Sequence, residues 1–156
     1  MWPSHAKFLA VLLLCASAHA QDPVLAPNAP KDKPTAVQAR DKFERSIAPF
    51  VAQAKSTYPQ AKERFLKGLP KGQAFFVTTR LYGADGNYEQ VFIAVQSIRD
   101  GQIIGRIWSE IHVVHAYKYK DPYAFPEDRL LDWLITKPDG SEEGNFVGKF
   151  LDTYKG

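Results

Sequence analysis

The sequence predicts a single α+β domain, in which N-terminal helical segments pack on a curved antiparallel sheet of about four to six strands. Apolar residues recur at helical spacing between residues 36 and 67, and alternating apolar stretches separated by turn residues follow from residue 74. Helices followed by a run of strands with short connections are typical of the α+β class.

Residues 1–20 have the pattern of a signal peptide. Lys7 precedes an apolar run over 8–15, and Ala18 and Ala20 give the small-x-small pattern of a cleavage site. We expect cleavage after Ala20, a periplasmic or secreted protein, and no transmembrane segment in the mature chain. Residues 21–35 contain four prolines and read as a linker, which leaves residues 36–156 as one domain.

Composition excludes several function classes. Cys15 is the only cysteine and leaves with the signal peptide, so the mature domain is disulfide-free and has no thiolate nucleophile or thiolate metal site. The net charge of +3 falls to +2 when Lys7 is removed, which does not favour nucleic acid as a partner. The sequence contains no P-loop, dinucleotide-binding glycine pattern or G-x-S-x-G motif, and we expect no cofactor.

The helical region is predicted as two segments. Phe43, Ile47 and Ala54 fall on one helical face, but Pro49 should kink or split the helix near Ala48. A second helix is expected to begin at Pro59 and to run to about residue 67.

Two hairpins are predicted next. Residues 74–82 and 88–98 flank the loop GADGN, and pairing Tyr82 with Tyr88 places Val77 opposite Ile93 on an apolar face. A turn at Asp100-Gly101 leads into residues 103–109. There we expect a three-residue loop with a bulge at Gly101 that places Ile107 opposite Val95.

The C-terminal part is predicted to contain a further strand, over residues 113–120, near a sheet edge. Residues 130–136 have apolar side chains at both odd and even positions, which fits a strand or a helix. Residues 137–145 are predicted to form a loop. The last segment, 146–154, fits a strand or a short helix.

The order of motifs resembles the YegJ-like family, a bacterial domain of unknown function. The resemblance covers residues 59–151 and rests on AKERFLKGL, AFFVTTRLY, DGQIIGRI, DRLLDWLI and GNFVGKF, with Glu89 at a strand start. Its most specific part is a structural motif formed by Asp132, Trp133, Gly144 and Phe146. The chain departs from the family pattern at Gln90, Phe92, Val147, Lys149 and 123–125. The resemblance implies a shared fold and no established activity.

Glu89 and Asp132 are the candidate catalytic pair. Each lies among apolar residues, where a carboxyl group can have a raised pKa and act as a general acid or base. The alternative is structural: each carboxylate accepts backbone N–H groups or pairs with Arg80, Arg106 or Lys149.

The segment HAYKYKDPYAF supplies candidate binding residues because it alternates aromatic and basic side chains: Tyr117, Lys118, Tyr119, Lys120 and Tyr123. The alternative is a strand with tyrosines in the core and lysines in water. His112 and His115 have a spacing that binds zinc only on a helix, and because the segment reads as a strand we expect no metal site.

These observations favour an exported, non-catalytic binding or structural module whose partner is an unidentified protein or cell-envelope ligand. An immunity-type inhibitor of a periplasmic toxin enzyme and a hydrolase using Glu89 and Asp132 are the alternatives.

Overall fold

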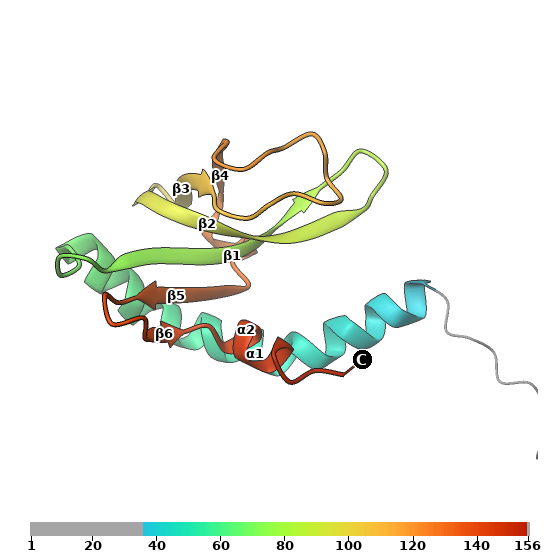
Figure 1. Ribbon diagram of the computed structural model, residues 1–156, viewed down its shortest axis with the longest axis horizontal. Helices are drawn as coiled ribbons and strands as arrows, with labels where there is room; N and C mark the ends of the chain where they lie inside the picture. The colour runs from blue at the N-terminus through green and yellow to red at the C-terminus, as the bar shows by residue number, and fades with distance from the viewer. Residues whose placement is uncertain (1–35, 156) are drawn as a thin grey trace, which may run out of the picture. The chain divides into compact units, whose positions relative to one another are not determined.

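The computed structural model describes residues 36–155, so the predictions for the signal peptide and the linker lie outside the described residues. The described chain forms two α-helices, a short 3₁₀ segment and six strands (Figure 1). In chain order these are α1 (Ala36–Lys67), β1 (Ala74–Tyr82), β2 (Tyr88–Arg99), β3 (Gln102–Ile107), β4 (Pro122–Pro126), η1 (Glu127–Arg129), β5 (Asp132–Thr136), β6 (Glu142–Gly144) and α2 (Phe146–Leu151).

The strands form one antiparallel sheet in the order β4-β3-β2-β1-β5-β6. The long helix α1 lies along the β5 side of the sheet, and α2 lies against α1 (Figure 1). This arrangement confirms the predicted α+β class and the predicted range of strand numbers.

The prediction of two helical segments is wrong, because α1 is one helix of 32 residues with Pro49 and Pro59 inside it. Both prolines are exposed, so water can solvate the carbonyl groups that they leave without a helical partner. Ile47 and Ala54, to either side of Pro49, are buried. Burial on both sides of the proline holds the helix together where local propensity would break it.

One face of the sheet forms the core. Val77, Ile93 and Ile107 are completely buried there, and α1 contributes Ala54, Tyr58 and Ala61 to the same cluster. The predicted register between β1 and β2 is confirmed, since Tyr82 pairs with Tyr88 and Val77 with Ile93. The alternation of apolar residues was sufficient to set this register because a slip by one residue would turn the apolar set away from the core.

The second hairpin differs from the prediction. Its turn has two residues, Asp100 and Gly101, both with positive φ (51° and 71°), as in the tight turns that match the twist of a hairpin. The register shift lies within β2, between Val95 and Ser97, so Ile107 pairs with Ile93 and not with Val95. The buried face is preserved by a bulge in the strand instead of one in the turn.

Residues 113–120 form turns and not the predicted strand, because side chains take up their backbone N–H groups. Glu89 accepts those of residues 112–114, and Asp121 accepts that of Lys118 at 3.0 Å. Lys120 has a left-handed φ of 69°. The edge strand is instead β4, whose prolines at both ends blunt the edge.

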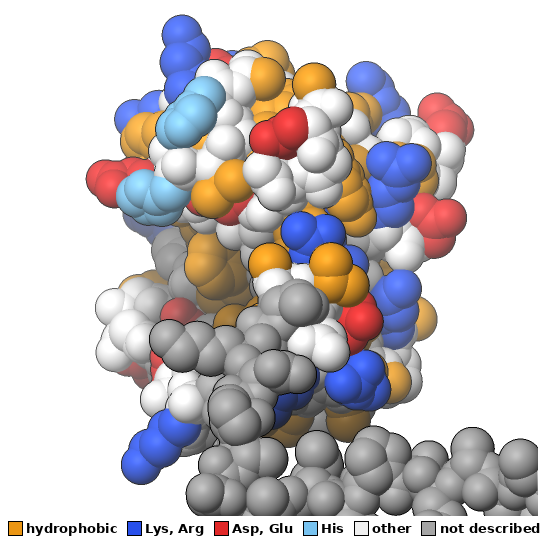
Figure 2. Space-filling view, turned by 90° about the vertical axis from the view of Figure 1, so that its right-hand side faces the viewer, with side chains coloured by type: hydrophobic (Ala, Val, Ile, Leu, Met, Phe, Trp, Pro, Cys, Tyr) orange, Lys and Arg blue, Asp and Glu red, His pale blue; other side chains and the backbone are white. Residues whose placement is uncertain are grey.

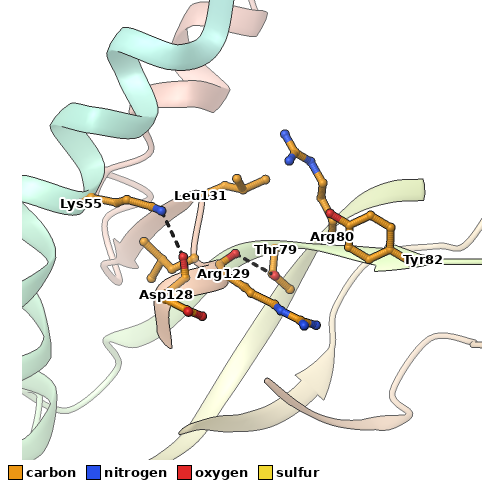
Figure 3. Close-up of a pocket in the computed structure, with 8 residues that line it drawn as sticks. Lys55, Thr79, Arg80, Tyr82, Asp128, Arg129 and Leu131 are labelled. Atoms are coloured by element: carbon orange, nitrogen blue, oxygen red, sulfur yellow. Dashed lines mark hydrogen bonds between the residues drawn. The ribbon is translucent and has the colours of Figure 1, made fainter. Parts of the chain in front are cut away.

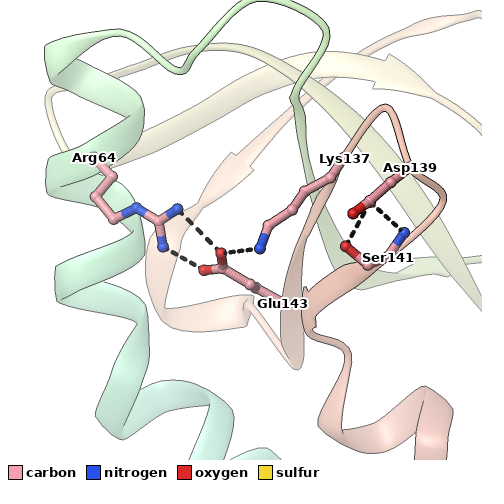
Figure 4. Close-up of polar contacts among 5 residues, drawn as sticks. All are labelled: Arg64, Lys137, Asp139, Ser141 and Glu143. Carbon is pink, nitrogen blue, oxygen red and sulfur yellow. Dashed lines mark hydrogen bonds and ion pairs between the residues drawn. The ribbon is translucent and has the colours of Figure 1, made fainter.

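An ion-pair cluster ties the C-terminal half of α1 to the β5–β6 hairpin (Figure 4). Glu143 accepts from Arg64 of α1 and pairs with Lys137 at 2.8 Å, while Asp139 accepts two bonds from Ser141 in the adjoining turn. The hydrogen bonds from Arg64 and Lys137 lower the pKa of Glu143 to about 2. The short strand β6 therefore lies inside the segment predicted as a loop, held by its neighbours.

Candidate functional site

Glu89 anchors the connection between β3 and β4. Its carboxylate accepts the N–H of His112 at 2.9 Å and that of Val113 at 2.9 Å, with a longer bond from Val114. Burial acts to raise the pKa of Glu89, but the backbone bonds outweigh it and hold the pKa below its usual value. An ionised carboxylate occupied in this way holds a loop in place.

Asp132 caps the short helix α2 from inside the protein. Only 1% of the residue is exposed, and its carboxylate accepts the N–H of Trp133 at 2.8 Å and that of Val147 at 2.7 Å. Burial raises the pKa of Asp132 above its ordinary value, and the bonds from Val147 and Trp133 act against this rise.

The register separates the two candidate acids. Asp132 pairs with Thr78, whereas Glu89 pairs with Leu81, three residues further along β1. Since paired residues share a face and neighbours along a strand alternate, the two carboxylates lie on opposite faces of the sheet. This placement gives them no common cleft in which to act as an acid–base pair.

The four residues of the structural motif, Asp132, Trp133, Gly144 and Phe146 (the DW motif), form one junction. The Trp133 ring packs edge-on against Phe146 with centroids 6.0 Å apart, and its Nε1–H donates to the Ala54 carbonyl at 3.2 Å and to Thr57 Oγ1 at 3.0 Å. Gly144 passes directly against the backbone and the ring of Trp133. The junction joins β5, β6, α1 and α2.

His112 and His115 are both exposed. Histidine side chains, pale blue in Figure 2, lie on the surface of the described part of the chain. His112 and His115 belong to a turn-rich connection and not to a helix. Among residues 36–155, no group of three or more His, Cys, Asp or Glu side chains could hold a metal ion.

The five candidate binding residues do not form one surface: two tyrosines pack against the core, and the others lie on exposed parts of the chain. Tyr117 and Tyr123 are half-buried against the core, with ring centroids 5.6 Å apart, and burial raises the pKa of Tyr123. Tyr119 is 44% exposed and contacts Trp108, with centroids 5.2 Å apart. The Lys120 amine lies 5.7 Å from the centre of the Trp108 ring and 5.1 Å from that of Tyr119, whereas Lys118 is exposed and appears in none of these ring contacts.

Tyr119 belongs to an exposed aromatic patch on the sheet face opposite the core. The patch comprises Phe76, Phe92, Trp108 and Tyr119; Phe92 is 38% and Trp108 43% exposed. Phe76, Phe92 and Trp108 also line a cavity of about 250 Å³. Sequence reasoning missed these three, although the even-numbered positions of β1 and β2, which point away from the core, carry Phe76 and Phe92.

A second hollow adjoins the aromatic patch, and Phe92 lines both. This amide pocket has a volume of about 160 Å³ and lies between the sheet and α2; Thr78, Gln90, Ser109, Asn145, Val147 and Leu151 are among its lining residues. The side-chain nitrogen Nε2 of Gln90 is buried and has no hydrogen-bond partner among the described residues. A buried amide without a partner is uncommon, because its desolvation is not offset.

A third hollow, of about 390 Å³, opens between η1 and the end of β1 that extends past β5 (Figure 3). Lys55, Arg80 and Arg129 line it, but two of these cations have partners. The Lys55 amine donates to the Asp128 carbonyl at 3.0 Å, and Arg80 pairs with Glu44 of α1. In Figure 3 the guanidinium groups of Arg80 and Arg129 point in different directions, so they do not converge on one anion.

No protein-family model, curated protein or solved structure matches the chain. Among the helices of residues 36–155, none has the length and apolar character needed to span a membrane.

Proposed function

We propose that this protein is an exported, non-catalytic binding module of the bacterial envelope, and that the aromatic patch is its ligand-binding surface. The observation that carries the proposal is the grouping of Phe92, Trp108 and Tyr119 on the open sheet face, each more than a third exposed. Soluble proteins expose single apolar residues routinely, but a contiguous cluster of rings is typical of an interaction site. Aromatic rings also give a large contact area with little loss of side-chain entropy.

The patch is held rigidly, which favours binding. The Trp108 N–H donates to the Phe92 carbonyl at 2.7 Å, and the Lys120 N–H donates to the Ile107 carbonyl at 2.8 Å. Glu89 holds the β3–β4 connection at His112, whose N–H it accepts. A surface that is already ordered loses less entropy when a ligand binds.

The contacts of the two candidate acids support a non-catalytic role. Glu89 and Asp132 accept backbone N–H groups and lie on opposite faces of the sheet. We also propose that the chain is a YegJ-like domain. The junction around Trp133 supports a structural role for the DW motif in that fold.

Cosedimentation of the purified protein with an insoluble bacterial envelope fraction tests this function. Trp108→Ala should reduce the bound fraction at least fivefold, because it removes the central ring of the patch. Leu66→Ala is the control, since Leu66 is an apolar residue of α1 that is 57% exposed and is not among the patch residues. Equal sedimentation of the two variants would contradict the assignment of the surface, and recovery of the protein from the cytoplasm of its host would contradict export.

A further inference from the structure

We infer that the aromatic patch, together with three cations beside it, docks on the surface of an anionic phospholipid bilayer. The inference rests on the proposed function and names the component of the envelope that the patch meets. It follows from the way exposed rings and unpaired cations lie together on the open sheet face and on the β3–β4 connection, residues 108–121.

The exposed apolar side chains are concentrated at the patch. Seven large apolar residues of the described chain are exposed, and four of these lie on β2 or in the β3–β4 connection: Phe92, Trp108, Val113 and Tyr119. Trp and Tyr are enriched where membrane proteins cross the lipid headgroups, since each ring has an apolar body and a polar end. Rings of this kind suit the headgroup layer of a bilayer.

Three cations lie beside the rings. The Lys120 amine lies 5.1 Å from the centre of the Tyr119 ring and 5.7 Å from that of Trp108. Lys118 is exposed immediately before Tyr119. Arg106 is exposed on β3, and its guanidinium donates to the Lys120 carbonyl at 3.1 Å. None of the five ion pairs among the described residues includes Arg106, Lys118 or Lys120, so their charges are available to anionic headgroups.

Three acids lie in the same region, and their side chains are shorter. Asp121 accepts the Lys118 N–H, and Glu142, which lines the patch cavity, accepts from Asn145. Glu110 is exposed in the β3–β4 connection. Because a lysine amine stands on a four-carbon stem, it can contact the phosphate layer while its stem stays beside the rings. We therefore expect a moderate preference for anionic lipid.

Other occupants fit this surface less well. Peptides commonly bind by adding a strand to a sheet edge, but the β4 edge carries Pro122 and Pro126, and the other edge strand, β6, has three residues. In a two-fold contact between copies, the same cations would face one another, since each copy presents the same surface. A bilayer needs neither a strand edge nor complementary side chains, only accessible rings and cations.

Cosedimentation of the purified protein with two kinds of vesicle tests the inference. One kind is phosphatidylcholine alone, and the other contains about one-third phosphatidylglycerol, which supplies a negative surface potential. The protein should partition onto the anionic vesicles roughly fivefold more strongly or better, the effect of one cation near a charged membrane. Equal partitioning onto both kinds, or no binding to the anionic vesicles, would overturn the inference.

Replacing cations tests which surface meets the bilayer. Lys118→Gln combined with Lys120→Gln should weaken partitioning onto the anionic vesicles roughly tenfold or more. The control combines Lys42→Gln with Lys155→Gln, which removes the same charge at exposed positions of α1 and of the segment after α2. An equal loss in the control would overturn the assignment of the surface.

Tryptophan fluorescence gives a second readout that needs no variant. In the chain without residues 1–20, Trp108 and Trp133 are the only tryptophans, and Trp133 is 6% exposed. Anionic vesicles should shift the emission of the exposed Trp108 to shorter wavelength, because its indole leaves water for the headgroup layer. Emission that saturating anionic vesicles leave unchanged would overturn the placement of Trp108 at the headgroups.

Envelope from which the lipid has been extracted separates this inference from the proposed function. The expected result is loss of sedimentation after extraction, together with binding to anionic vesicles. If the protein sediments with delipidated envelope in a Trp108-dependent way and binds neither kind of vesicle, the lipid inference fails and the proposed function stands. If neither envelope nor vesicles bind the protein, both fail.

Discussion

Gly144 packs against Trp133 so closely that no side chain fits between them. A Cβ at Gly144 would lie 2.8 Å from Cε3 of the indole and inside van der Waals contact with the Trp133 carbonyl oxygen, and the φ of Gly144 is 75°. The glycine lets β6 pass across the indole and leads the chain into α2, where Asp132 caps the first turn. The spacing between the DW pair and Gly144 is thus a packing requirement.

Gly144→Ala should lower the free energy of unfolding by roughly 3 kcal/mol, since overpacking adds to a positive φ. Gly140→Ala is the matched control: its φ is 80°, but no atom lies within 4 Å of the added Cβ, so about 1–2 kcal/mol is expected. Urea denaturation of both variants measures the difference, and equal losses would show that the contact with Trp133 relaxes freely.

Trp133→Ala should cost about 3–5 kcal/mol, as truncation of a large core side chain does. Trp133 is 6% exposed, and its Nε1–H bonds to α1 as well. Trp108→Ala, which removes an exposed indole, should cost no more than about 1 kcal/mol. Thermal melts distinguish the two, and similar losses would place Trp108 in the stabilising core.

Glu89→Ala should release the β3–β4 connection without unfolding the domain. Three backbone N–H groups lose their acceptor, so hydrogen exchange at residues 112–114 should accelerate at least tenfold. Glu110→Ala, at an exposed position of the same connection, provides the comparison. Unchanged protection of these amides would mean that Glu89 does not hold the loop.

Glu143 should contribute to the loss of stability in acid. Arg64 and Lys137 lower the pKa of Glu143 from 4.5 to about 2 in the folded protein. A depressed folded pKa means that the stabilisation is present above pH 4.5 and is lost as the pH falls toward 2. Glu143→Gln should therefore show a flatter stability profile between these values in denaturation experiments. Parallel profiles for Glu143→Gln and wild type would contradict the ion-pair assignment.

Asp132 should change the pH dependence of stability in the opposite direction from Glu143. Burial raises the pKa of Asp132 above 3.8, so the folded protein retains a proton that the unfolded chain has lost. The contribution of Asp132 is complete below pH 3.8 and declines as the pH rises through the folded pKa. The stability of the wild type relative to Asp132→Asn should decrease over that window. A difference that rises with pH would mean that the backbone donors to Asp132 outweigh its burial.

The sequence by itself determined the α+β class, the β1–β2 register and the strand positions up to Ile107. These features depend on local periodicity, which a one-residue slip would destroy by exposing the apolar face. It did not determine the continuity of α1, because burial of Ile47 and Ala54 offsets the break expected at Pro49. Only the tertiary structure decided that residues 113–120 form turns, since their acceptors include Glu89, more than twenty residues earlier in the chain.

The candidate site, too, was only partly predictable from the sequence. Tyr119 and Lys120 stood out in the sequence because basic and aromatic residues alternate there, but Trp108, Phe76 and Phe92 come from three different strands or strand ends. Their grouping, and the isolation of the Gln90 amide beside α2, depend on contacts between segments far apart in the chain. Periodicity predicts which side of a strand a residue takes, whereas packing between distant segments decides what it meets there.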